Sequence, residues 1–538
     1  MKRTALFTLV CVWFALGASA VVSRAIFDRL PHLEDEFAYL YQARIFARGE
    51  THIETPQPIR AYWQPFLISD HGRRFGKYTP GWPLALAPGA RLGQPWIVNA
   101  WLAMLIVALI YRLGREIYNP ETGAVAALLM AISPTALLLN GTLMAHTATL
   151  FFVTLFVFAV WRVERGRRAL LWGIAGGLAL GLALITRPLT AAGVAAPFAL
   201  YFAGRVLWRG IRGAWRDGLL LPLAAAAGTM LLVGLIWPWF NYRVSGPPGE
   251  SFPAYLGRFL RGDDDTNLYL RIWGYDRVGF GEGYGRSGHT LEKGWRHTRT
   301  DLRCAARDLL GWAAPAPDEV DLTRNACAAN GRGYSWLLLP LGLLMGARRR
   351  WTWLLAALPA SLVATYIAYW IGGSLYSARY YYEGWSAAIL IGAVGVTGLA
   401  RLADRLLLRR RAADGWRPAW AIYGALGALV VYSLVVFTPA RLEPLRGYGR
   451  ISQAQIDEVN RLRREPDRPL VVIVWGEHHW RDVAALMAVT DPHLDSDIVL
   501  ARDPDQANLD TLLAQWPDRE KLFFVNGEYS HDPPAPGD

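Results

Sequence analysis

The residues with the clearest chemical potential are two adjacent carboxylates, Asp35 and Glu36, which follow directly on the first long apolar run. A carboxylate in such a place can accept a proton from a hydroxyl nucleophile and act as a general base. Glu34, Asp35 and Glu36 also begin a segment with helical spacing. Acidic residues in the first turn of a helix compensate its free N–H groups and its dipole. The pattern alone leaves both interpretations open.

Three basic residues, Lys77, Arg187 and Arg379, lie near the ends of apolar runs or in the segments between them. Such cations bind phosphate oxygens, and a guanidinium can hold two of them at once. The alternative for each is an interfacial side chain whose charged end simply reaches water. Tyr78 and Tyr380, which directly follow two of these cations, are further candidate substrate-binding residues.

Two histidines complete the set of candidates. His146 lies between two apolar runs, where we expect it to hydrogen-bond to the substrate. The alternative is an ordinary interfacial histidine. His289 lies in a glycine-rich stretch, and we expect it to belong to a loop that covers the site.

The elements that must position these residues are membrane-spanning helices. With 53% hydrophobic and only 19% charged residues, the chain is too apolar for an ordinary soluble protein. Its apolar residues form runs of about 20, which is long enough to cross a bilayer as helices. We predict about eleven spans, at 5–26, 93–112, 121–140, 147–162, 169–187, 189–207, 218–240, 334–347, 351–372, 384–402 and 418–438.

The orientation follows from the short basic clusters, which recur at alternate ends of the runs. Basic loops remain in the cytoplasm, so we predict a cytoplasmic N-terminus and an extracytoplasmic C-terminus. The first run resembles a cleavable signal peptide around Ala18-Ser19-Ala20, but it continues to Ile26, which favours a retained helix. The net charge of +12 resides in these loops, and no recognisable nucleic-acid-binding module accompanies it.

Three long segments then face outward: residues 27–92, residues 241–333 and the tail. The tail reads as a small α/β unit, with strands predicted at 470–475, 498–500 and 521–525. We therefore divide the chain into a membrane domain, 1–440, and an extracytoplasmic α/β domain, 441–538.

Two of the three cysteines, Cys304 and Cys327, lie in the same predicted outward loop. Oxidising compartments favour disulfides, so we predict that this pair forms one. Two free thiols are the alternative.

The acidic pair directly after the first helix, followed by a predicted interfacial helix, resembles the first outward loop of the GT-C superfamily of membrane glycosyltransferases. Protein O-mannosyltransferases and bacterial lipid A aminoarabinose transferases are the most similar families. The stretch Gly76-Lys77-Tyr78-Thr79-Pro80-Gly81-Trp82-Pro83-Leu84 resembles the Tyr-Pro-Pro-Gly-type segment of that loop, and Arg379-Tyr380-Tyr381 resembles an Arg-Tyr element. The resemblance covers about residues 1–440.

The resemblance implies a catalytic carboxylate at Asp35, with Glu36 either orienting the acceptor or supporting Asp35. It implies transfer of a sugar, with inversion, from a polyprenyl-phosphate carrier to a glycan, lipid or protein acceptor at the outer face of a membrane, the bacterial inner membrane in particular. Some relatives carry a second acidic residue near the position of His146. This chain has none there, so a divalent metal lacks a supporting ligand.

Two other classes of function remain open. A transporter or flippase of lipid-linked sugars would carry charged residues inside its spans and interrupted helices in matched halves, which the sequence does not display. A non-catalytic envelope assembly subunit would use the tail to recruit partners, but that role leaves Asp35 and Glu36 unexplained.

Overall fold

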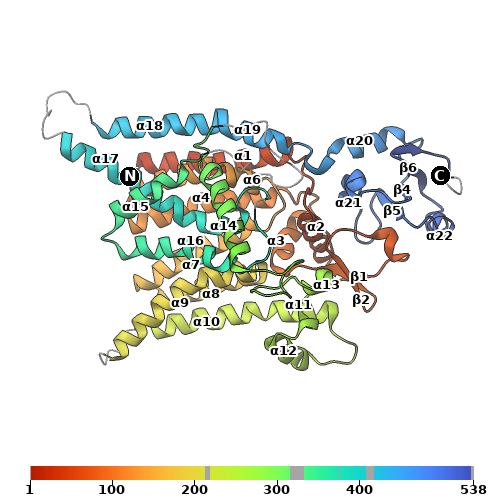
Figure 1. Ribbon diagram of the computed structural model, residues 1–538, viewed down its shortest axis with the longest axis horizontal. Coiled ribbons are helices and arrows are strands. Elements are labelled where there is room, and N and C mark those ends of the chain that lie inside the picture. Colours follow the sequence, from red (N-terminus) through yellow and green to blue (C-terminus); the bar gives the residue numbers. More distant parts are fainter. Residues whose placement is uncertain (1, 212–217, 315–331, 374, 408–416, 535–538) are drawn as a thin grey trace.

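The computed structural model describes residues 2–211, 218–314, 332–373, 375–407 and 417–534, and long helices that run side by side dominate it (Figure 1). Among the described residues, eight helical stretches are long and apolar enough to cross a membrane. A ninth results if α5 and α6, which are bent by 59° at Ser133-Pro134, count as one span. The helices of the bundle are α1 (Lys2–Ala25), α4 (Ile97–Ile117), α5 (Pro120–Ile132), α6 (Pro134–Asn140), α7 (His146–Glu164), α8 (Ala169–Thr186), α9 (Pro188–Ile211), α10 (Leu220–Gly234), α11 (Ile236–Ser245), α15 (Leu338–Gly346), α16 (Arg350–Tyr366), α17 (Trp385–Leu407) and α18 (Ala419–Tyr432).

Each of the eleven predicted runs coincides with one of these helices or with a consecutive pair. The runs at 334–347 and 351–372 form α15 and α16, which are shorter than the other spans. The predicted helical membrane fold is therefore confirmed, with eight or nine full-length spans in the described residues.

Close packing inside the bundle depends on small residues. Gly173, Gly177 and Gly181 are four residues apart on α8 and face α10. A Cβ atom at Gly173 would lie 2.3 Å from the carbonyl oxygen of Pro222, and one at Gly177 would lie 2.2 Å from that of Ala226. Such spacing of small residues lets two membrane helices approach closely.

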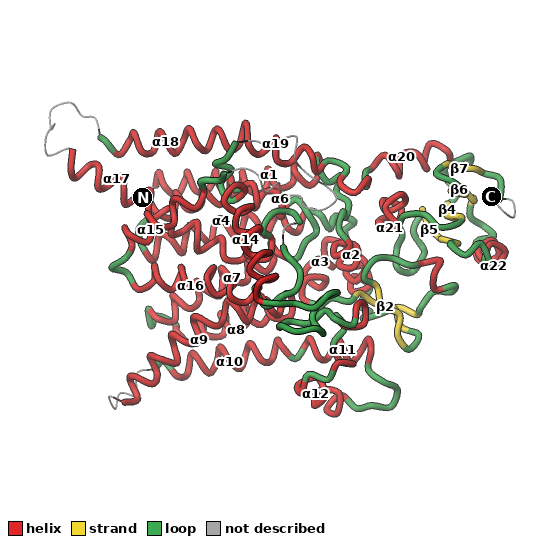
Figure 2. The backbone as a smooth tube through the Cα atoms, viewed as in Figure 1, coloured by secondary structure: helices red, strands yellow, loops and turns green. Residues whose placement is uncertain are grey.

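The N-terminus lies toward one end of the bundle, and most of the non-helical segments gather at the other end (Figures 1 and 2). At that loop-rich end, α2 (Glu34–Ala47) follows α1 after a short turn. A three-stranded antiparallel sheet, in the order β1-β3-β2, comes next along the chain, together with the 3-10 helix η1. The bounds are β1 (Ile53–Glu54), η1 (Ile59–Tyr62), β2 (Leu67–Asp70), β3 (Arg73–Gly76) and α3 (Gly81–Arg91).

The second loop-rich segment, predicted above as the outward residues 241–333, and a later short turn complete this end of the molecule. The second segment contains the helices η2, α12, α13 and α14, and η4 lies just before α17. Their bounds are α12 (Phe252–Arg261), η2 (Asp264–Thr266), α13 (Leu270–Trp273), α14 (Leu291–Asp308) and η4 (Arg379–Gly384). After α18, the chain passes through η6 (Ser433–Phe437), α19 (Thr438–Leu442), η7 (Glu443–Leu445) and η8 (Tyr448–Arg450).

The C-terminal residues form the predicted α/β unit, built on a four-stranded sheet in the order β5-β4-β6-β7. β4 pairs in parallel with β5 and β6, whereas β7 is antiparallel to β6. The three predicted strands are confirmed, and β7 and α20 are additions that the sequence did not predict. The bounds are α20 (Gln453–Leu462), β4 (Leu470–Trp475), η9 (Trp480–Val483), α21 (Ala484–Val489), β5 (Ile498–Asp503), α22 (Leu509–Gln515), β6 (Glu520–Val525) and β7 (Glu528–Ser530).

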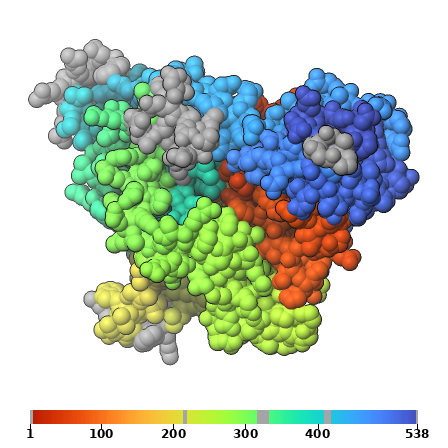
Figure 3. All heavy atoms as spheres, turned by 45° about the vertical axis from the view of Figure 1, so that its right-hand side comes forward, coloured from red at the N-terminus to blue at the C-terminus, as the bar shows by residue number. Residues whose placement is uncertain are grey.

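The first loop-rich segment, residues 27–92, packs against both sides of this C-terminal unit. Leu30 and Phe37 pack into the core on one side of its sheet, and Ala61 and Tyr62 pack on the other side. In Figure 3 the two segments, coloured orange-red and blue, meet along the surface. The unit is therefore attached to the segment that carries Asp35.

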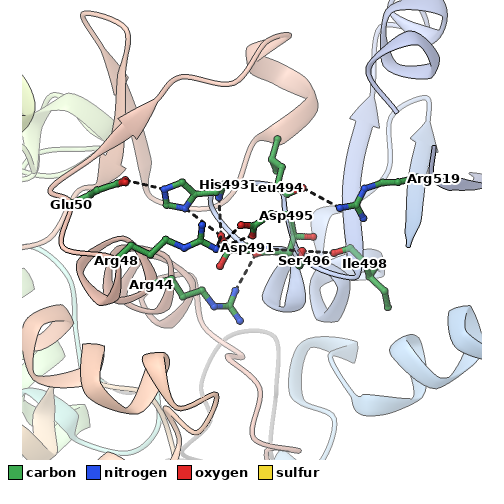
Figure 4. Close-up of polar contacts among 11 residues, drawn as sticks. Arg44, Arg48, Glu50, Asp491, His493, Leu494, Asp495, Ser496, Ile498 and Arg519 are labelled. Atoms are coloured by element: carbon green, nitrogen blue, oxygen red, sulfur yellow. Dashed lines mark hydrogen bonds and ion pairs between the residues drawn. The ribbon is translucent and has the colours of Figure 1, made fainter. Parts of the chain in front are cut away.

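Polar contacts at the end of α2 add to this attachment (Figure 4). Arg44 donates a hydrogen bond to the carbonyl oxygen of Thr490 (3.0 Å), and Arg48 forms ion pairs with Asp491 (3.2 Å) and Asp495 (2.8 Å). Each of these contacts joins residues that are more than 400 positions apart in the chain.

The predicted interfacial helix is α2, and it is buried on more than one face. Its side chains from Glu36 to Ala43 are all buried, as is Ile45. The membrane bundle covers one side of the helix and the C-terminal unit covers another, so no polar face is left exposed.

Candidate functional site

Asp35 lies in the first turn of α2, and its side chain is 18% exposed. Arg379 of η4 places Nη1 3.1 Å from Asp35 Oδ2, and the hydroxyl of Tyr78 donates a hydrogen bond to Oδ1. The carboxylate thus has one guanidinium and one phenol as partners, while part of its surface remains open.

That open surface faces a cavity of about 860 Å³ at the loop-rich end of the bundle. Its wall is formed by both loop-rich segments and by residues near the ends of α8, α9, α11 and α16. Six of the nine predicted site residues line it: Asp35, Lys77, Tyr78, Arg187, Arg379 and Tyr380. The fold brings these six together from four distant parts of the chain.

Lys77 follows β3, and its ammonium group is buried at the cavity wall. Its Nζ lies 3.2 Å from Asp276 Oδ2, and both side chains are 2% exposed. Four aromatic rings surround the ammonium, those of Trp273 (4.2 Å) and Phe66 (4.4 Å) being the closest. Burial lowers the pKa of Lys77, and the negative charge of Asp276 opposes this shift.

Two arginines contact the same tyrosine ring. The guanidinium carbon of Arg379 lies 5.3 Å from the centre of the Tyr380 ring, and that of Arg187 lies 5.6 Å from it. Arg187 caps the C-terminal end of α8, just before Pro188 begins α9. Both of these guanidinium groups therefore lie on the wall of the cavity, in addition to Lys77.

Glu36 is turned away from the cavity. Its carboxylate accepts hydrogen bonds from the backbone N–H groups of His32 (2.6 Å), Leu33 (3.3 Å) and Leu143 (3.0 Å). Burial raises the pKa of Glu36 to about 7, although these donors oppose the shift. Because backbone donors occupy both oxygens, the geometry favours the supporting role over contact with an acceptor.

Neither predicted histidine lines the cavity. His146 is fully buried and contacts Arg187 and Glu383, each at 3.2 Å. The Nε2 atom of His289 lies 2.9 Å from the carbonyl oxygen of Ile367, and its ring stacks on Phe280. The hydrogen bond to the substrate that we expect of His146 has no support in this arrangement, and the expectation that His289 belongs to a loop covering the site stays a prediction.

Two carboxylates that the sequence did not single out belong to the site. Asp276 pairs with Lys77 and also accepts hydrogen bonds from Tyr369 (3.0 Å) and Trp370 (3.1 Å). Glu383 is buried and pairs with Arg187. A carboxylate four residues after Arg379 was the one available signal for Glu383, and Asp276 had none.

Two further expectations concern a metal ion and a disulfide. Within the part of the chain that the structure describes, no group of three or more His, Cys, Asp or Glu side chains could hold a metal ion. Cys304 is buried, but Cys327 lies outside the described residues, so the predicted disulfide stays a prediction.

Comparisons with known proteins agree with the predicted fold. The family model described as dolichyl-phosphate-mannose-protein mannosyltransferase matches residues 89–237. No curated protein sequence matches the chain.

Two solved proteins are similar over most of the chain. ArnT from Cupriavidus metallidurans bound to undecaprenyl phosphate matches with 15% identity and a TM-score of 0.54, covering 97% of this chain and 93% of that one. The apo form of the Archaeoglobus fulgidus oligosaccharyltransferase matches with 15% identity and a TM-score of 0.51, covering 89% of this chain but only 63% of that one. The chain thus has the GT-C fold, with a small C-terminal α/β unit.

Proposed function

We propose that the protein transfers a sugar from a polyprenyl-phosphate carrier to an acceptor hydroxyl. The observation that carries the proposal is the single cavity in which the Asp35 carboxylate lies beside Arg379, with Arg187 and Lys77 on the same wall. Displacement at a sugar carbon bonded to phosphate needs a base for the acceptor and cations for the leaving group. The likeness in fold to a protein solved with undecaprenyl phosphate supports this donor class.

In the proposed reaction the acceptor oxygen bonds to the anomeric carbon from the face opposite the phosphate. The bond between that carbon and the phosphate oxygen breaks, and its electron pair leaves with the polyprenyl phosphate. Asp35 takes the proton of the acceptor hydroxyl, and the configuration at the anomeric carbon is inverted. Arg379 and Arg187, which both contact the Tyr380 ring, stabilise the charge of the leaving phosphate.

Each of the three candidate cations has a carboxylate partner in the absence of substrate: Arg379 pairs with Asp35, Lys77 with Asp276, and Arg187 with Glu383. Of the three carboxylates, Asp35 and Asp276 line the cavity. A donor phosphate that engages Arg379 competes with Asp35 for the guanidinium. Donor binding therefore makes the Asp35 carboxylate available to the acceptor, so the donor binds before the acceptor.

The remaining features of the proposal concern location and partners. The loop-rich end faces the extracytoplasmic side, with the N-terminus in the cytoplasm, because the basic clusters lie at the opposite ends of the spans. The acceptor is a glycan, lipid or protein, and the sugar is a hexose or pentose. Residues 1–440 form the transferase domain, and residues 441–538 form a small extracytoplasmic α/β domain.

The test is transfer of labelled sugar by the purified protein, with polyprenyl-phosphate mannose as the first donor of a panel. Asp35→Asn keeps the size of the side chain but removes the base, so turnover should fall about 10²–10⁴-fold. Asp28→Asn is the matched control, since Asp28 belongs to the same loop and contacts Gln453 rather than the cavity. Equal turnover in the parent and in Asp35→Asn would remove Asp35 as the base. Absence of transfer from every donor would remove the proposed reaction.

A further inference from the structure

The guanidinium of Arg187 is held by side chains from four separate elements. Its Nη2 donates to the hydroxyl of Tyr366 (2.9 Å), and its Nε lies 3.3 Å from Thr190 Oγ1. Its Nη1 lies 3.2 Å from His146 Nε2, and Nε lies 3.2 Å from Glu383 Oε1. These partners belong to α16, α9, α7 and η4, so the position of Arg187 depends on the packing of four elements.

The chemistry of arginine fixes the proton on His146. A guanidinium only donates hydrogen bonds, so His146 Nε2 must accept the bond from Arg187. The ring proton is then on Nδ1, which lies 3.2 Å from Glu383 Oε1 and donates to it. A neutral histidine thus links the guanidinium to the carboxylate, and Arg187 Nε contacts the same carboxylate oxygen directly.

Burial of the Glu383 carboxylate carries a free-energy cost. Its side chain is 0% exposed, and among the described residues its second oxygen, Oε2, has no hydrogen-bond partner. A buried carboxylate is costly unless it is paired, and one with an unsatisfied oxygen is a poor source of stability. Its ion-pair partners in the described part of the chain are Arg187 and His146, and Arg187 in turn lines the cavity beside Tyr380.

We propose that Glu383 is a positioning residue for the donor phosphate, acting through His146 and Arg187. It holds the guanidinium over the Tyr380 ring at the cavity wall, in the orientation that meets phosphate oxygens. Neither Glu383 nor His146 touches the substrate. The inference rests on the proposed function, because it assumes that Arg187 binds the phosphate of a polyprenyl-phosphate donor.

The experiment measures binding of undecaprenyl phosphate to the purified full-length protein in detergent, which needs no knowledge of the sugar. Glu383→Gln keeps the shape of the side chain but removes its charge, and its dissociation constant should rise about tenfold, which corresponds to about 1.4 kcal/mol. Arg187→Ala should weaken binding at least as much. Adding Glu383→Gln to Arg187→Ala should change the constant by less than about twofold, because a positioning residue has nothing left to position.

Two further variants separate positioning from packing. Gln at position 146 can accept from Arg187 and donate to Glu383, so His146→Gln should stay within about threefold of the parent. His146→Leu fills a similar volume without the link and should match Glu383→Gln. Equal binding by both variants would mean that only volume matters at position 146 and would overturn the inference.

Glu164→Gln is the control for loss of a buried carboxylate. Glu164 is 1% exposed, pairs with Arg205 and Arg350, and ends the helix that His146 begins, about 27 Å away along the helix axis. This variant should bind undecaprenyl phosphate like the parent. If Glu383→Gln has no effect, or weakens binding equally with and without Arg187, the positioning role is wrong while the proposed function stands. If the parent itself does not bind undecaprenyl phosphate, both fail.

Discussion

Replacing Asp276 with asparagine should destabilise the protein by about 3–5 kcal/mol, because it leaves a buried ammonium without its counter-charge. Lys77 Nζ lies 3.2 Å from Asp276 Oδ2, and the 2% exposure of both side chains leaves little room for water to replace the lost charge. The surrounding rings still attract the ammonium, each by about 0.5–2 kcal/mol, but they do not replace a full negative charge.

Removing the other partner of the pair, Lys77, should destabilise the protein less. Lys77→Met leaves the Asp276 carboxylate with hydrogen bonds from Tyr369 (3.0 Å) and Trp370 (3.1 Å), so its charge stays partly compensated. We expect a loss of about 1–3 kcal/mol. The double variant, Lys77→Met with Asp276→Asn, places an apolar side chain among the four rings and removes both charges. It should recover about 2 kcal/mol relative to the sum of the single variants.

Denaturant unfolding in detergent, followed by tryptophan fluorescence, measures all three variants. Asp505→Asn is the control, since Asp505 pairs with Arg60 at the surface with the two side chains 44% and 61% exposed. An exposed pair contributes at most about 1 kcal/mol. If Asp276→Asn costs no more than this control, or if the two single effects simply add in the double variant, the buried pair is not the element that holds Lys77.

Three other predictions concern pH, orientation and the cysteines. Burial raises the pKa of Glu36 from about 4.5 to about 7, so on acidification the folded protein binds a proton here before the unfolded protein does. The free energy of unfolding should therefore rise by about 3 kcal/mol in all as the pH falls from 7 to 4.5. A pH-stability profile that Glu36→Gln leaves unchanged would contradict this. A cysteine in place of the exposed Asp467 should react with a membrane-impermeant maleimide in intact spheroplasts, and one in place of Arg167 only after lysis; the opposite result would reverse the orientation. Non-reducing peptide mapping should recover Cys304 linked to Cys327. A disulfide that closes a loop of about 24 residues should stabilise the folded protein by about 3 kcal/mol. Two free thiols would contradict this prediction.

The sequence was sufficient for the helices of the bundle because a membrane span is a local property. About 20 consecutive apolar residues specify a helix whatever its neighbours are, and the predicted runs accordingly coincide with helices. The same holds for the all-buried strand 470–475, where six consecutive apolar residues predict a central strand.

The environment of α2 could not be predicted in the same way, because it depends on contacts distant in the sequence. Phe37 packs into the core of a unit that begins more than 400 residues later, and Arg44 donates to Thr490. Apolar spacing along α2 indicated only which residues are buried by some surface. It did not indicate that two surfaces would cover the helix.

The electrostatics of the site show the same division between local and distant information. A cation near a membrane surface is conspicuous in an apolar sequence, so Lys77, Arg187 and Arg379 were identified as candidates. Their counter-ions lie 199, 196 and 344 positions away in the chain, and nothing local distinguishes Asp276 from other carboxylates of its loop. The pairing matters for function because a cation already bound to a buried carboxylate is oriented but partly neutralised. In the proposed reaction the donor phosphate competes with Asp35, the proposed base, for the guanidinium of Arg379.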